Sequence, residues 1–180
     1  MPINIGDKPQ ADFNSPLELM MDCHRRIERF LQVLQKVAQA PSLDEPNRAA
    51  LRAALDYFKI SGPRHNQDEE RSLLPAMLAS GNVAVAEAVV QLNRLAAEHA
   101  IADQKHQRLG VVAEEWLGTN IISEENRREL MGLIASLIDL YQSHIAMEEQ
   151  EIFPLASRVL APQTLASIGE QMRQRRQSRS

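Results

Sequence analysis

Four stretches of the sequence place apolar residues at spacings of three and four, and short segments containing Pro, Gly, Asn or Ser separate them. This period matches one face of an α-helix, so each stretch predicts a long helix with one buried side. The stretches run from Ser15 to Pro41, from about Leu51 to Pro75, from about Val85 to Gly118 and from Ser123 to Pro154. Because the connections are short, neighbouring helices should be antiparallel, which predicts an all-α, up-down-up-down four-helix bundle.

Two features refine this arrangement. Gly62 and Pro63 lie inside the second stretch, so a kink or a short break is expected just before His65. A fifth, short helix is expected at about 163–175, packed outside the bundle. The chain is therefore divided into an N-terminal extension at 1–14, a bundle at 15–160, and a short helix with a basic tail at 161–180.

The charge balance argues against nucleic acid as a partner. The net charge is −4, and four arginines lie in the last ten residues: Arg173, Arg175, Arg176 and Arg179. Without them, sixteen basic residues are set against 24 acidic ones, and an acidic surface repels phosphates. The basic tail itself is expected to be a frayed and solvated helix end.

Neither a membrane segment nor a secretion signal is expected. The longest apolar stretch, Leu130–Leu140, is about half a membrane span and contains Asp139, and the first residues show no basic-then-apolar pattern. The single cysteine, Cys23, cannot form an internal disulfide, which agrees with a reducing compartment. These observations predict a cytoplasmic protein.

Four of the five histidines have a carboxylate four residues later. The pairs are His24 with Glu28, His65 with Glu69, His99 with Asp103, and His144 with Glu148. Residues four apart lie one helical turn apart on the same side, so one helix can offer an imidazole and a carboxylate to the same ion. Each of these histidines also lies in register with the apolar side of its helix, which predicts that it is buried.

The chain also repeats a short pattern. Residues 65–75 read HNQDEERSLLP and residues 144–154 read HIAMEEQEIFP, which share His, Glu, Glu and Pro at the same offsets. Two helical hairpins related by a pseudo-twofold axis would explain the repeat.

The predicted helix lengths place three of the histidines at one level. At about 1.5 Å per residue, His24, His65 and His144 each lie about 12–14 Å from a helix end. His99 lies deeper in its helix, which must therefore overhang the others by nearly two turns. Four buried imidazoles beside buried carboxylates are costly unless cations lie among them, so the pattern predicts a metal site.

Further residues near this site are also candidates for a role in it. Glu28 and Asp103 are expected to face inward as additional candidate ligands. His106, two turns beyond His99, is a candidate for an outer position or for core packing. Glu70 and Glu149 follow Glu69 and Glu148 directly and should point away from the site, towards solvent or an outer position. Cys23 is expected to pack in the core.

The histidine pattern resembles the hemerythrin-like HHE cation-binding family over roughly residues 15–155. The matching residues are His24, His65-x3-Glu69, Glu98-His99 and His144-x3-Glu148. The resemblance implies a four-helix bundle holding two iron ions with an oxo or hydroxo bridge. It also implies that His24, His65, His99 and His144 are iron ligands and that Glu69 and Glu148 bridge the two irons. Zinc and manganese accept the same donors.

One position departs from the oxygen-carrying members of that family. They have a fifth ligating histidine where this chain has Asp103, and its loss leaves open positions on the irons. The resemblance therefore implies a protein that binds O2, NO or peroxide in sensing, storage or detoxification. An enzyme is the alternative: an iron donor for iron–sulfur repair, a peroxidase or an NO reductase. A metal-free helical interaction module, with the histidines as core residues, is a third hypothesis.

Overall fold

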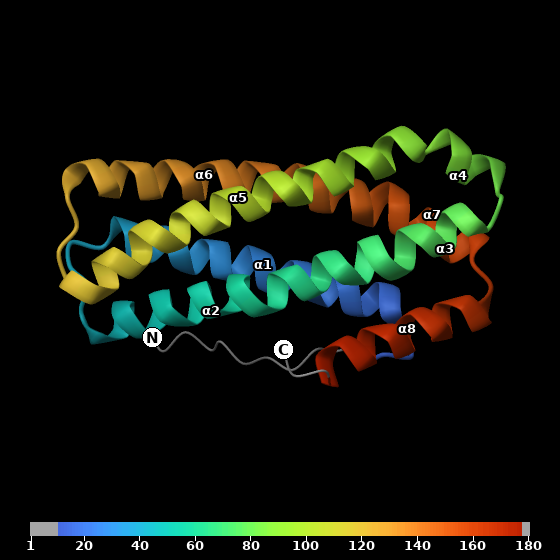
Figure 1. The fold of residues 1–180 in the computed structure, drawn as a ribbon, viewed down its shortest axis with the longest axis horizontal. Helices are drawn as coiled ribbons and strands as arrows, with labels where there is room; N and C mark the ends of the chain where they lie inside the picture. The colour runs from blue at the N-terminus through green and yellow to red at the C-terminus, as the bar shows by residue number, and fades with distance from the viewer. Residues whose placement is uncertain (1–10, 178–180) are drawn as a thin grey trace.

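The computed structural model describes residues 11–177, and within them every regular element is helical. Four long helices lie side by side (Figure 1). They are α1 (Pro16–Gln39), α2 (Glu45–Asp68), α5 (Val89–Thr119) and α6 (Glu124–Met147). The predicted all-α helical bundle is confirmed.

The long helices contact one another in a ring. α1 packs against α2 and α6, and α5 packs against α6 and α2. The chain reverses direction between successive long helices (Figure 1). Side chains cap the starts of two of them: Asp44 accepts from the Asn47 amide at 3.0 Å, and Ser123 accepts from the Asn126 amide at 3.1 Å.

The second helix continues through Gly62 and Pro63 as far as Asp68. Pro63 removes one helical hydrogen bond, and the packed helix tolerates that loss. The predicted break before His65 is therefore absent, and the departure from α geometry comes after His65 instead.

Two wide turns of π-helix interrupt the long helices one turn after His65 and His144. They are η1 (Glu69–Leu73) and η2 (Glu148–Ile152), which lead into α3 (Leu74–Ala79) and α7 (Phe153–Val159). The Leu74 amide donates to the Glu69 carbonyl and the Phe153 amide to the Glu148 carbonyl, five residues back in each case.

These wide turns explain how the chain passes two prolines. Pro75 and Pro154 lie in the first turn of α3 and α7, where a missing amide hydrogen is tolerated. The prediction that the helices stop at these prolines was wrong, because each π turn starts a new α-helical segment before the proline. The repeated sequence pattern thus builds the same local structure twice.

The predicted fifth helix is present as α8 (Pro162–Gln177), which packs against α1 and α2. Arg175 and Arg176 each lie 2.7 Å from a carboxylate oxygen of Asp68, which is fully buried. The expected solvated tail was therefore wrong for these two arginines, because a buried acid on α2 binds them. Arg179 lies outside the described residues.

The segment before α1 lies against α8. Gly169 of α8 is so close to this segment that an added Cβ would lie 1.9 Å from the Phe13 carbonyl oxygen. The guanidinium groups of Arg173 and Arg176 lie 5.3 and 5.6 Å from the Phe13 ring centroid. The start of the described chain is thus fixed to its end.

The interior contains two apolar clusters. One includes Phe30, Leu51 and Trp116, and the other includes Met20 and Leu95. On all four long helices the two clusters are separated by buried polar residues, namely His24, His65, Glu69, His99, His144 and Glu148. We call this set the polar belt.

One continuous helical stretch in the described chain, Glu124–Val159, is long and apolar enough to cross a membrane by length and composition alone. That criterion is weak, because the core helix of a soluble protein also meets it. This stretch carries the buried polar side chains His144 and Glu148. Its apolar residues Leu130, Ile134 and Leu137 are buried in one of the apolar clusters.

Candidate metal centre

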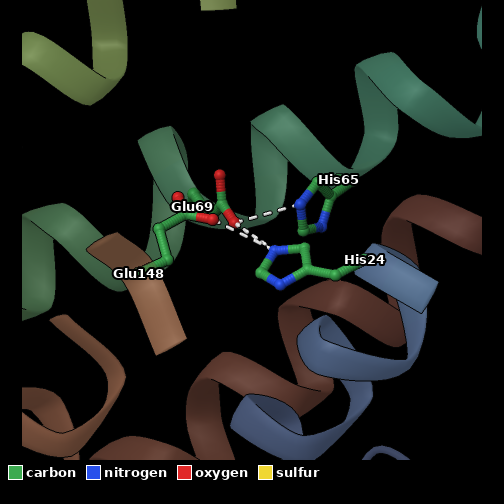
Figure 2. Close-up of side chains that lie close together, drawn as sticks. All are labelled: His24, His65, Glu69 and Glu148. Atoms are coloured by element: carbon green, nitrogen blue, oxygen red, sulfur yellow. Dashed lines mark ion pairs between the residues drawn. The ribbon is translucent and has the colours of Figure 1, made fainter. Parts of the chain in front are cut away.

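The six residues of the polar belt converge in two groups whose ligand atoms lie within 4.8 Å of one another. The first group is His24, His65, Glu69 and Glu148, and the second is Glu69, His99, His144 and Glu148. Figure 2 shows the first group, with both imidazoles turned towards the two carboxylates. The two groups share Glu69 and Glu148, so they form one dinuclear candidate site.

Each shared carboxylate places one oxygen in each group. For Glu69, Oε1 lies 3.2 Å from His65 Nε2 and Oε2 lies 3.1 Å from His99 Nε2. For Glu148, Oε2 lies 3.0 Å from His24 Nε2 and Oε1 lies 3.1 Å from His144 Nε2. This is the arrangement that two bridging carboxylates require.

The centre is closed off from solvent. None of its six residues is more than 3% exposed. Four of its buried atoms, His24 Nε2, both carboxylate oxygens of Glu69 and Glu148 Oε2, have no hydrogen-bond partner of suitable geometry. Unsatisfied buried polar atoms are costly, and these four converge on common points as metal ligands do. The donor set therefore fits two cations.

The protonation of each histidine and carboxylate in the centre depends on its neighbours. Burial alone would raise the pKa of Glu69, but His65, His24 and His99 lower it well below its ordinary value. Burial alone would lower the pKa of His24, but Glu148, Glu149 and Glu69 raise it well above its ordinary value. Without metal, the carboxylates thus attract protons to the imidazoles, and cations would take the place of those protons.

Three of the four histidines have a second carboxylate on the nitrogen that faces away from the centre. The Nδ1 atoms of His24, His99 and His144 lie 2.8, 2.8 and 2.9 Å from oxygens of Glu149, Glu70 and Glu98, respectively. A carboxylate that accepts the Nδ1 hydrogen leaves the Nε2 lone pair directed at the metal and fixes the ring.

Glu70 and Glu149 were expected either in solvent or in an outer position, and the structure shows the outer position. The sequence did not identify their partners, because each carboxylate reaches a histidine on a neighbouring helix. Helical spacing describes neighbours on the same helix and says nothing of such pairs. The only available signal was the repetition of Glu70 and Glu149 at the same place in both copies of the repeated pattern.

The fourth histidine, His65, has a thiol as its neighbour. Its Nδ1 has no carboxylate partner, and the Cys23 side chain lies beside the ring. Burial raises the pKa of Cys23, but His65 and Arg26 outweigh this effect and leave the pKa below its ordinary value. Cys23 is therefore more than a packing residue, because it contacts a residue of the polar belt.

The three additional candidates lie outside both groups. Glu28 is 42% exposed and pairs with Arg25 at 3.0 Å. Asp103 is exposed. Their expected inward orientation was wrong. A carboxylate four residues after a histidine lies about 40° further around the helix, at the edge of its buried side. Glu69 and Glu148 share this offset but begin the two π turns and are buried, whereas Glu28 and Asp103 lie in regular α-helix.

His106 is less exposed than Asp103 but also lies outside the centre. Its Nε2 is 3.2 Å from the Tyr141 hydroxyl, and its ring stacks on Phe58 with 4.1 Å between centroids. Burial lowers its pKa to about 4, so the ring is neutral at pH 7. His106 and Asp103 line a cavity of about 560 Å³ between α2 and α5. The structure thus places His106 against Phe58 and Tyr141, outside both groups.

The third long helix has fewer residues before His99 than the sequence predicted. α5 begins at Val89, about three turns before His99, and the preceding residues form the separate short helix α4 (Val83–Glu87). The break at Ala88 removes most of the overhang that an unbroken helix would need. It accounts for His99 reaching the level of the other three histidines.

Comparisons with known proteins agree with this geometry. A family model described as Hemerythrin HHE cation binding domain matches residues 15–156. The chain is also similar to an uncharacterized protein of Haemophilus influenzae, with 26% identity over 170 residues that cover 93% of each chain. The family match spans the whole polar belt.

Proposed function

Because the chain belongs to the hemerythrin HHE cation-binding family, we propose that it is a non-haem di-iron protein that binds O2, NO or peroxide in sensing, storage or detoxification. Bound iron would supply redox chemistry and an open coordination position for such a small ligand. A cytoplasmic location is part of this proposal, and the single cysteine, Cys23, supports it because it agrees with a reducing compartment.

We assign the ligands from the two groups. His24 and His65 would hold one ion, His99 and His144 the other, and Glu69 and Glu148 would bridge them. One observation carries this assignment: Glu69 and Glu148 each place one carboxylate oxygen in the first group and the other oxygen in the second group. Imidazole and carboxylate ligands suit iron, and they also suit zinc and manganese.

The surroundings support a site for a small ligand. The polar belt lies between two apolar clusters, so bulk water is excluded from it. Asp103 occupies the position of the further histidine of the oxygen carriers but is exposed and outside both groups. Each ion would then have only two imidazoles and two carboxylate oxygens, which leaves room for a diatomic molecule or peroxide.

Metal analysis tests this proposal. Protein purified from iron-replete cells should contain about two irons per chain, and its ultraviolet-visible spectrum should change on exposure to air. The variant His65→Ala should lose iron and the spectral change, whereas His106→Ala should keep both because His106 lies outside the groups. Zinc as the only metal in both preparations, or equal iron in wild type and His65→Ala, would contradict the assignment.

An enzyme is the second candidate, and the open positions favour it. Steady turnover of peroxide or NO that is lost in His65→Ala would identify a peroxidase or an NO reductase. Transfer of iron to a damaged iron–sulfur protein would identify a repair donor. A reversible spectral change without turnover would favour binding or sensing.

A further inference from the structure

A second cavity, of about 480 Å³, lies between the segment before α1 and the helices α1, α2 and α8. None of the six residues of the polar belt lines it. Its walls include Arg26 from α1, Arg64 from α2 and Arg176 from α8. The cavity therefore collects positive charge from three separate helices in a chain whose net charge is −4.

Little negative charge within residues 11–177 balances these arginines. Arg176 is paired with Asp68 at 2.7 Å. Asp12, the acidic residue of the cavity wall, already accepts hydrogen bonds from the amide and the side chain of Asn14 at 2.8 and 3.0 Å. Arg26 has one long hydrogen bond, 3.4 Å from its Nε to the Asp22 carbonyl oxygen.

Arg64 is the clearest case. Within the described chain its guanidinium group forms no ion pair or hydrogen bond, although the residue is half-buried. A partly desolvated cation without a partner is unfavourable, and an anion beside it removes that cost. A guanidinium fork binds the two oxygens of a carboxylate or phosphate especially well.

The rest of the wall is apolar or aromatic. Phe13 and Leu19 line the cavity, and Tyr57 contributes a ring that stacks on Phe30 with 4.3 Å between centroids. A hydrated inorganic ion would leave these surfaces unused. An organic molecule would bury its apolar part against them while its charged group faced the arginines.

We propose that this cavity binds a small organic oxyanion, with its carboxylate or phosphate group against Arg26 and Arg64 and its apolar part against Phe13 and Leu19. The site does not depend on bound metal. Cys23 also lines the cavity and lies beside His65, so a molecule bound here would lie next to the metal centre without entering it.

Calorimetric titration of the full chain, as purified with its metal, tests this inference. The probes are 3-phenylpropionate, phenyl phosphate and the neutral amide 3-phenylpropionamide. One oxyanion should bind per chain, and the amide should bind at least about tenfold more weakly, because it lacks the charge-assisted hydrogen bonds. The preferred oxyanion distinguishes a carboxylate site from a phosphate site. Equal binding of the amide, or the absence of saturable binding, would overturn the proposal.

Variants distinguish binding in the cavity from a general attraction of the anion to the positive charges of the protein. Arg64→Gln should weaken binding about tenfold, and Arg64→Lys should weaken it less because the charge remains. Arg128→Gln on α6 removes the same charge from an exposed position that does not line the cavity, so it should bind as wild type. Equal losses in Arg64→Gln and Arg128→Gln would contradict the assignment. If Arg64→Gln does not fold, Arg26→Gln gives the same comparison.

Discussion

Each histidine of the centre uses its two ring nitrogens differently. Nε2 faces the shared carboxylates, and in His24, His99 and His144 the outer Nδ1 is held by a further carboxylate. Each outer carboxylate belongs to a residue next in sequence to a proposed ligand, and it accepts from a histidine on another helix. Metal affinity should therefore depend on residues that never touch the metal.

The variant Glu149→Ala tests this dependence. Glu149 accepts from His24 Nδ1 at 2.8 Å and also pairs with Arg25. Its loss frees the imidazole to rotate or change tautomer, so metal affinity should fall about 10- to 100-fold. Competition with a chelator of known affinity measures this change. Glu151→Ala removes an exposed acid from the same π turn and should leave the affinity unchanged. Equal losses in both variants would point to net charge rather than to the His24 contact.

His106 predicts a pH dependence of stability. Its pKa is about 4 in the folded chain, below its ordinary value of 6.5, because burial disfavours the charged ring. The unfolded chain therefore takes up the proton first, and stability is lost as the pH falls from 6.5 towards 4. By about pH 4.5 this loss should be on the order of 2 kcal/mol.

The comparison uses His106→Gln, which keeps a partner for the Tyr141 hydroxyl but has no titrating group. Urea unfolding of both metal-free proteins at pH 7 and 4.5 gives the four free energies. The variant should lose about 2 kcal/mol less than wild type on acidification. Because the polar belt titrates in both proteins, its contribution cancels in the difference. Equal losses would show that the pKa of His106 is not lowered in the folded chain.

At the scale of single residues, the sequence predicted which residues form the polar belt but did not predict which side chains contact its histidines. Helical register placed the four histidines, Glu69 and Glu148 inside, and all six are buried. The resemblance to a known family, rather than register, singled out these two carboxylates over Glu28 and Asp103. The contact of Cys23 with His65 crosses from α1 to α2, so spacing along one helix could not reveal it.

Among the helices, the connections between elements were harder to predict than the elements themselves. The apolar period identified the long helices, because three or more turns of regular spacing seldom arise otherwise. The predicted helix ends at Pro75 and Pro154 were wrong, because a π turn before each proline allows the chain to continue as a helix. π turns have no clear sequence signature and often occur at functional sites.

Two glycines offer a test of the contact between the start of the chain and α8. In Gly169→Ala the new Cβ would lie 1.9 Å from the Phe13 carbonyl oxygen, so the segment before α1 must move. We expect a loss of about 1–3 kcal/mol in unfolding free energy.

The matched variant Gly132→Ala lies in α6, where an added Cβ meets nothing within 4 Å. It should raise stability by about 0.5–1 kcal/mol, because alanine favours the helix over glycine. Thermal and urea unfolding measure both changes. A stable Gly169→Ala protein would show that the segment is not held against α8 in solution.

For the molecule as a whole, we expect the polar belt to couple metal binding to folding. It lies across the middle of the bundle with an apolar cluster on either side, and its buried polar atoms lack partners without cations. Removal of metal with a chelator should therefore lower the melting temperature, and added iron should restore it. With metal at about a thousand times its Kd, the stabilisation is about 4 kcal/mol.

The variant His65→Ala is the control for this experiment, since its melting temperature should respond much less to the chelator. An unchanged melting temperature in the wild-type protein would instead favour the metal-free interaction module. Differential scanning calorimetry with matched metal analysis distinguishes the two outcomes.

The two shared carboxylates have a consequence for the history of the chain. The first hairpin supplies His24, His65 and Glu69, and the second supplies His99, His144 and Glu148. The fourth residue of each group comes from the opposite hairpin. Neither half could complete a coordination sphere alone, yet two copies of one half could complete both. A gene duplication that joined a symmetric pair of hairpins would produce this reciprocity. The halves, expressed as separate polypeptides, should then reassemble more readily when the proposed metal ions are added.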